Sequence, residues 1–124
     1  MTPHTAPALD PSRVAGKALV RAAEALGLSQ AEVAKVLGSS TASVSRTFSG
    51  ERGVDPDSAE GRNALLLVRV FRSLDPLVGG DTAKARLWLH AKNRHLGDVP
   101  ARLLTSTQGL VHVADYLDAM RGRL

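Results

Sequence analysis

LSQAEVAKVLGSSTASVSRTFSG, residues 28–50, has the pattern of two short helices joined by a tight turn. Ser29 and Glu32 have the S-x-x-E spacing of a capping box, in which the hydroxyl and the carboxylate each accept a hydrogen bond from an otherwise unpaired backbone N–H. The first helix is therefore expected to begin near Gln30. Gly38 ends it, because glycine takes the left-handed conformation at this position without steric cost.

A second helix is predicted from about Thr41 to Phe48, with Ser40 as its N-terminal cap. Val44 and Phe48 are four residues apart and share one face, so we expect both to point inward. The side chains left facing outward belong to Thr41, Ala42, Ser45 and Arg46.

The rest of the chain predicts further helices and no strand of comparable strength. Apolar residues recur at helical spacing from about Ser12, and Gly27 closes that helix. Cap and breaker residues then delimit a long helix from Asp57 or Ser58 to about Leu74, a helix from Asp81 to Ala91, a short helix over residues 100–104, a turn from Thr105 to Gly109, and a last amphipathic helix from Leu110 to Met120. We predict an all-α fold, an N-terminal helix-turn-helix bundle followed by a small C-terminal helical domain.

Three segments are expected. Residues 1–11 are rich in proline and poor in large apolar side chains, which predicts a disordered arm. Residues 12–57 form the helix-turn-helix domain, and residues 58–124 form a second helical domain that dimerises. Apolar side chains from Leu65 to Leu74 cover more than one face of the long helix, so this helix is either the centre of the fold or part of a homodimer interface.

The charge of the chain is unevenly distributed. The net charge is +4, yet residues 1–62 hold seven Lys or Arg and seven Asp or Glu, so the excess lies entirely in residues 63–124. If the helix-turn-helix contacts DNA, a neutral half around it predicts weak affinity for DNA in a monomer and a shallow salt dependence of binding. Occupancy of DNA would then require a dimer or larger assembly that places several such motifs on repeated half-sites.

Several functions are not favoured by the sequence. No run approaches the roughly 18 apolar residues of a membrane span, and the N-terminus lacks the order of a signal peptide, so we expect a cytoplasmic protein without membrane contact. The chain has no cysteine, and its four histidines lack a metal-ligand spacing. Asp115 and Asp118 share a face of the last helix, a spacing more typical of solvated than of catalytic acids. We expect neither enzymatic activity nor a cofactor.

The helix-turn-helix pattern resembles that of the phage-repressor-like family, on the positions of Gln30, Ala34, Gly38 and the run from Thr41 to Arg46. In such modules the second helix enters the major groove of DNA by its N-terminal end, and the first crosses the phosphate backbone. The resemblance implies base contacts by Thr41, Ala42 and Arg46, with Gln30, Ser40 and Ser43 at or near phosphates and Ser45 on the same outer face.

A second resemblance covers the C-terminal half. The order Trp88-Leu89, Asn93, Leu96-Gly97, Pro100, Leu103-Leu104, Gly109, Val113 and Leu117 is similar to the toxin-binding domain of MbcA/ParS/Xre-type antitoxins, with Lys92 in place of that family's more usual proline. The resemblance implies an antitoxin that neutralises a RES-domain toxin, an enzyme acting on NAD, and that represses its own operon. Its toxin-facing set would be Tyr116, Met120, Arg121, Arg123 and Leu124. We expect Trp88, Leu103, Leu104 and Val113 in the core instead.

Two other functions stay open at this point. One is a stand-alone transcriptional regulator whose C-terminal half only dimerises. The other is an interaction adaptor that has lost DNA binding, because the motif lies in a neutral half and Ala42 is short for a base-contacting side chain.

Overall fold

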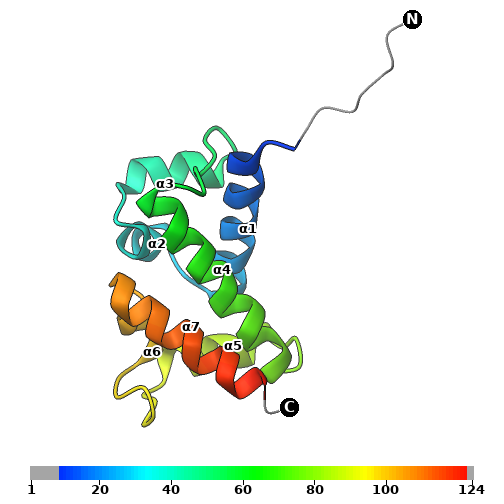
Figure 1. The fold of residues 1–124 in the computed structure, drawn as a ribbon, viewed down its shortest axis with the longest axis vertical. Helices are drawn as coiled ribbons and strands as arrows, with labels where there is room; N and C mark the ends of the chain where they lie inside the picture. The colour runs from blue at the N-terminus through cyan, green and yellow to red at the C-terminus, as the bar shows by residue number, and fades with distance from the viewer. Residues whose placement is uncertain (1–8, 123–124) are drawn as a thin grey trace, which may run out of the picture.

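A computed structural model describes residues 9–122, in which seven helices and no strand are present (Figure 1). This confirms the all-α prediction. The helices are α1 (Pro11–Leu26), α2 (Gln30–Leu37), α3 (Thr41–Phe48), α4 (Ala59–Leu77), α5 (Thr82–His90), α6 (Pro100–Leu103) and α7 (Thr107–Arg121). None of the helices within residues 9–122 is long and apolar enough to cross a bilayer.

The helix-turn-helix has the caps that its sequence predicts. The Ser29 hydroxyl accepts a hydrogen bond from the Glu32 N–H at 3.1 Å, and the Glu32 carboxylate accepts one from the Ser29 N–H at 3.0 Å. Gly38 closes α2 with a left-handed φ of 68°. The Ser40 hydroxyl accepts from the Ser43 N–H at 3.1 Å and caps α3. The predicted bounds of both helices are confirmed.

The first helix begins at Pro11, inside the segment that was expected to be an arm. The Asp10 carboxylate accepts a hydrogen bond from the Ser12 N–H at 3.0 Å, and proline is suited to the first helical position because its missing N–H would have no partner there. The predicted arm otherwise lies outside the described residues, except for residues 9 and 10. Leu19 and Leu26 are fully buried on the inner face of α1, as their spacing predicts.

Helix α4 is the centre of the fold. It crosses the molecule diagonally and packs against α1, α2, α5 and α7 (Figure 1). Leu67, Val70 and Leu74 are buried, whereas Leu65 is 43% exposed. This arrangement favours the first of the two alternatives for its apolar faces. The helix runs one turn beyond its predicted end at Leu74 and includes Pro76, one residue before its last residue, Leu77.

Helices α4 and α7 both begin with a serine cap followed three residues later by a glycine. The Ser58 hydroxyl accepts from the Gly61 N–H at 2.9 Å, and the Ser106 hydroxyl accepts from the Gly109 N–H at 3.0 Å. The expected turn from Thr105 to Gly109 is therefore wrong in its second half, because Ser106 starts α7 three residues early. Each glycine is required by close packing, since an added Cβ would lie 1.8 Å from the Asp55 carbonyl oxygen at Gly61.

Polar bridges join the two halves of the chain around one continuous hydrophobic core. Arg86 of α5 donates to the carbonyl of Glu24 at 2.8 Å, at the C-terminal end of α1. Asn63 of α4 donates to the carbonyl of Val36 at 3.1 Å and to the hydroxyl of Thr107 at 3.1 Å. The helix-turn-helix is thereby held against α4 and against the start of α7.

Candidate functional site

The outer face of α3 is as open as its sequence predicts. The side chains of Thr41, Ala42, Ser45 and Arg46 are all exposed. Val44 is buried beneath them and Phe48 is half-buried against the core, so α3 is anchored by its inner face only. The helix therefore presents a polar surface with one guanidinium, on Arg46.

The three other side chains expected at DNA lie around this face. Gln30 is exposed at the first position of α2. Ser40 is exposed and Ser43 is half-buried, and the Ser40 hydroxyl donates to the Ser43 hydroxyl at 3.0 Å. The structure thus brings Ser40 and Ser43 together at the start of α3, close in sequence to Thr41 and Ala42.

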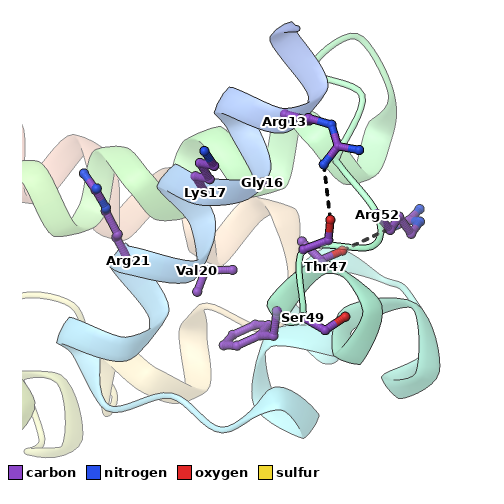
Figure 2. Close-up of a pocket in the computed structure, with 10 residues that line it drawn as sticks. Arg13, Gly16, Lys17, Val20, Arg21, Thr47, Ser49 and Arg52 are labelled. Carbon is purple, nitrogen blue, oxygen red and sulfur yellow. Dashed lines mark hydrogen bonds between the residues drawn. The ribbon is translucent and has the colours of Figure 1, made fainter.

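A groove runs between α1 and the C-terminal end of α3, with a volume of about 390 Å³ (Figure 2). Arg13, Lys17 and Arg21 line one side of it, and Phe48 and Ser49 line the other. The Arg13 guanidinium donates to the backbone carbonyl of Gly50 at 3.2 Å across one end. The sequence prediction of DNA contacts did not include the three cations of α1, although their i, i+4, i+8 spacing was a visible signal.

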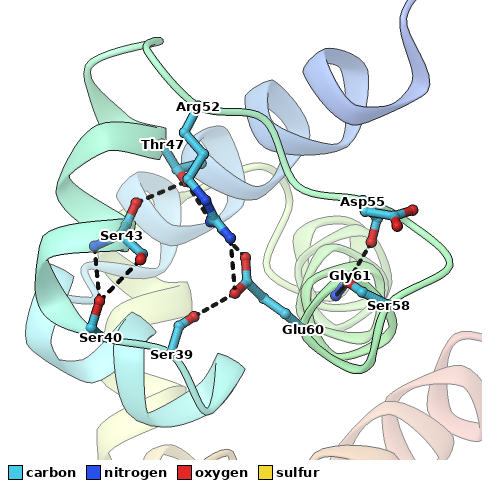
Figure 3. Close-up of polar contacts among 9 residues, drawn as sticks. All are labelled: Ser39, Ser40, Ser43, Thr47, Arg52, Asp55, Ser58, Glu60 and Gly61. Atoms are coloured by element: carbon cyan, nitrogen blue, oxygen red, sulfur yellow. Dashed lines mark hydrogen bonds and ion pairs between the residues drawn. The ribbon is translucent and has the colours of Figure 1, made fainter.

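A partly buried polar cluster joins the turn of the motif to α4 (Figure 3). The Glu60 carboxylate of α4 accepts hydrogen bonds from the Ser39 hydroxyl at 2.7 Å and from the Arg52 guanidinium at 2.7 and 3.3 Å. Arg52 also donates to the hydroxyl of the buried Thr47 at 3.4 Å. The cluster ties the loop after α3 and the turn before it to a single carboxylate.

The electrostatics of this cluster favour the charged forms. Burial raises the pKa of Glu60, but the hydrogen bonds from Arg52 and Ser39 outweigh it and hold that pKa below its ordinary value. The hydrogen bond with Glu60 raises the pKa of Arg52, against an opposing effect of burial. Sequence reasoning missed the pair, because its members lie eight residues apart across an irregular connector and no local pattern joins them.

The C-terminal half contains an aromatic stack. The Tyr116 ring of α7 lies 6.4 Å from the Trp88 ring of α5 and 6.0 Å from the His95 ring, centroid to centroid. Tyr116 and Trp88 are half-buried against the core and His95 is exposed. Of the other side chains expected in the core, Leu104 and Val113 are buried, and Leu103 is half-buried.

The residues predicted to face a toxin do not form one patch within the described chain. Tyr116 packs toward α5, whereas the exposed Arg121 lines a groove of about 550 Å³ between α7 and α4, with Leu65 and Arg72 on its other wall. Met120 is half-buried. Arg123 and Leu124 lie outside the described residues.

The two acids of α7, Asp115 and Asp118, are accessible to solvent, as expected, and both are also paired with Arg69. The Arg69 guanidinium donates to Asp118 at 2.6 Å and to Asp115 at 3.0 Å, and the Ser73 hydroxyl donates to Asp118 at 2.5 Å. The Ser73 hydrogen bond is the largest influence lowering the pKa of Asp118, burial opposes it, and Arg69 adds to the lowering. These contacts hold α7 to α4. No group of three His, Asp or Glu side chains within residues 9–122 is placed to hold a metal ion.

Comparison with known families matches both halves of the chain. The Antitoxin Xre-like helix-turn-helix domain matches residues 6–61, and the Antitoxin Xre/MbcA/ParS C-terminal toxin-binding domain matches residues 73–123. No curated protein matches the chain. The two matched domains stand in the same order as the helix-turn-helix and the α5–α7 unit of the structure. The chain belongs to the Xre/MbcA/ParS-type antitoxins, which combine a DNA-binding helix-turn-helix with a toxin-binding domain.

Proposed function

We propose that this antitoxin neutralises an NAD-consuming RES-domain toxin by covering its active site, and that it represses its own operon through the helix-turn-helix. The observation that carries the proposal is the match of a toxin-binding domain over residues 73–123, directly after a helix-turn-helix with an open outer face. A stand-alone regulator would not require a toxin-binding domain. The proposal assigns no catalytic step and no cofactor to this chain, and it places the protein in the cytoplasm with its DNA.

On the toxin side, we propose contacts from Tyr116, Met120, Arg121, Arg123 and Leu124. Arg121 supports this, since it is exposed at the end of α7, where its charge acts on Asp118 without a direct ion pair to any residue in the 9–122 range. A pocket that binds a dinucleotide and breaks it down can contain acidic catalytic groups. Guanidiniums at a chain end can pair with such groups through charge-assisted, two-point hydrogen bonds.

Titration of the purified toxin tests this arrangement. NAD consumption by the toxin is followed as the full chain, a chain ending at Met120, or an Arg121→Ala/Arg123→Ala variant is added. Loss of inhibition by the last two is expected, while the matched variant Lys92→Ala/Arg94→Ala inhibits like the full chain. Complete inhibition by the chain ending at Met120 would show that the tail does not cover the active site.

On the DNA side, we propose that α3 enters the major groove of the operator by its N-terminal end. Thr41, Ala42 and Arg46 then meet base edges, with Ser45 beside them, and Gln30, Ser40 and Ser43 lie at phosphates. Arg46 carries the sequence preference, because it is the one side chain of this set that can make a bidentate contact with guanine. The outward position of these side chains supports the assignment.

We also propose that residues 12–57 act as the DNA-binding domain and residues 58–124 as a domain for toxin binding and dimerisation. A homodimer within a larger toxin–antitoxin complex would place two copies of α3 on repeated half-sites, as operators for this motif require. The small number of base-contacting side chains on α3 supports such an assembly, because two weak contacts on one duplex add their free energies.

A further inference from the structure

Helix α1 carries a line of three cations on its outer face, here called the α1 stripe: Arg13, Lys17 and Arg21. All three side chains are exposed, and they line the same groove beside the C-terminal end of α3 (Figure 2). Residues spaced by four fall on one helix face, and a rise of 1.5 Å per residue gives the stripe a length of about 12 Å.

The charge of the stripe is not neutralised inside the protein. Arg13 contacts only a backbone carbonyl, that of Gly50, and Lys17 and Arg21 form no ion pair with any residue in the part of the chain that the structure describes. Glu24, three residues after Arg21, and Glu51, next to Gly50, are exposed and form no ion pair within that part. The stripe is therefore free to attract an external anion.

Three of the seven acids that balance the cations of residues 1–62 are engaged elsewhere. Asp10 caps α1, Glu32 completes the capping box of α2, and Glu60 is bound by Arg52 and Ser39. The acids and bases of residues 1–62 therefore cancel in a charge count but not in space. Several acids are used in local contacts, whereas the cations of the α1 stripe have no acidic partner among the described residues. The sequence prediction of few phosphate contacts in this half rested on that count.

We propose that the α1 stripe binds the phosphate backbone of DNA next to the segment read by α3. The inference rests on the proposed binding of DNA by α3. The groove that the stripe lines is closed on its other side by Phe48 and Ser49, so the stripe lies one helix away from the proposed base contacts and at a fixed distance from them. Along the duplex axis each strand carries one phosphate per about 3.4 Å, so a 12 Å line of cations corresponds to the axial rise of three to four phosphates of one strand.

A nucleic acid fits the stripe better than an acidic surface of the toxin does. The stripe and α3 lie at one end of the molecule, whereas the end of α7, which carries the proposed toxin contacts, lies toward the other (Figure 1). Phosphate contacts of this kind carry no sequence information, so the stripe adds affinity to every duplex while Arg46 discriminates between duplexes.

The test is the salt dependence of DNA binding by the full chain. Binding constants are measured between 50 and 200 mM salt for a duplex of the region upstream of the gene and for a scrambled duplex of equal length. The variant Arg13→Gln/Lys17→Gln/Arg21→Gln should lower the slope of log K against log salt by about 2–3 on both duplexes, because each phosphate that a cation neutralises adds about 0.9 to that slope. For three phosphate contacts, raising the salt from 50 to 200 mM should therefore reduce the binding constant of the wild type about 40 times more than it reduces that of the variant.

Two further variants make the result specific. Lys84→Gln/Lys92→Gln/Arg94→Gln removes the same charge from exposed positions of the C-terminal half and should keep the wild-type slope. Arg13→Lys/Lys17→Arg/Arg21→Lys keeps the charge and should restore the slope. Glutamine is a good helix former, and a thermal melt of each variant verifies that α1 has folded.

An unchanged slope in the α1-stripe variant would overturn the inference, and so would an equal reduction in the control variant. An unchanged slope together with weakened toxin binding would assign the stripe to an acidic protein surface instead. Both outcomes can be told apart from a failure of the proposed DNA binding by α3. In that case the wild type would bind the two duplexes equally, and Arg46→Ala would not change the binding of either duplex.

Discussion

The hydroxyl of Ser39, in the turn of the helix-turn-helix, donates a 2.7 Å hydrogen bond to the carboxylate of Glu60, in the first turn of α4. The same carboxylate receives Arg52 from the loop after α3. One side chain of the central helix therefore fixes both ends of α3, and through it the orientation of the face that carries Arg46. The position of the motif depends on α4 and not on its own two helices alone.

Replacing this carboxylate should loosen the motif. We expect Glu60→Gln to lower the free energy of unfolding by about 1–2 kcal/mol, because the carboxylate that Arg52 pairs with becomes an uncharged amide and Arg52 loses its counter-charge. Urea denaturation measures the change, with Glu24→Gln, an exposed and unpaired acid, as the matched control. Equal stability of the two variants would mean that the cluster is dispensable.

The pH dependence of stability should follow the paired carboxyls. The pKa values of Glu60 and Asp118 are lowered in the folded chain, so their contribution is complete above the ordinary carboxyl pKa and is lost as the pH falls through the folded values. Stability should therefore change little from pH 7 to 5 and fall below about pH 4.5. In a Glu60→Gln/Asp118→Asn variant, the melting temperature should fall less steeply as the pH is lowered through this range. The control variant Glu51→Gln/Asp57→Asn should show the same pH dependence of the melting temperature as the wild type.

The serine-x-x-glycine starts of α4 and α7 predict two intolerant glycines. A Cβ at Gly61 would lie 1.8 Å from the Asp55 carbonyl oxygen, and one at Gly109 would lie 2.0 Å from the Leu103 carbonyl oxygen. Each alanine substitution should cost about 1–3 kcal/mol, since backbone must move to admit the methyl group. Gly122→Ala is the control, because its nearest neighbour lies at 3.5 Å and its φ of −66° suits any residue. Melting temperatures that fall equally in all three would contradict the packing argument.

Arg46 should carry sequence preference without carrying much stability. Its side chain is exposed, and within residues 9–122 it has no ion-pair partner. We expect Arg46→Ala to remove about 1–3 kcal/mol of discrimination between the upstream duplex and a scrambled one, measured by competition binding. Lys35→Ala, which removes an exposed charge from α2, should leave the discrimination in place. A variant that still prefers the upstream duplex would assign specificity to other side chains.

The elements that sequence could predict are those whose causes are local. The capping box of Ser29 and Glu32, the left-handed Gly38 and the Ser40 cap act within a few residues, and the bounds of α2 and α3 follow from them. The predicted start of α7 is too late because Gly109 looks like a breaker in sequence. In the folded chain, Gly109 instead allows α7 to pack closely against α6, a contact that the sequence does not reveal.

The candidate site divides in the same way. Helical periodicity was enough to place Thr41 and Arg46 on an outer face. The pairing of Ser39 and Arg52 with Glu60 joins segments 21 and 8 residues apart, and no periodicity encodes it. The basic face of α1 was hidden for a different reason, because a charge count over residues 1–62 does not distinguish acids used as caps from acids left in solvent.

The most direct test of the antitoxin function is the intracellular NAD level when the reading frame next to this gene is expressed alone and together with this chain. Our account predicts that NAD and viability collapse in the first case and are restored in the second, with no restoration by a chain ending at Met120. A neighbour that leaves NAD and viability unchanged, or one whose effect on them persists when the full chain is co-expressed, would contradict the account.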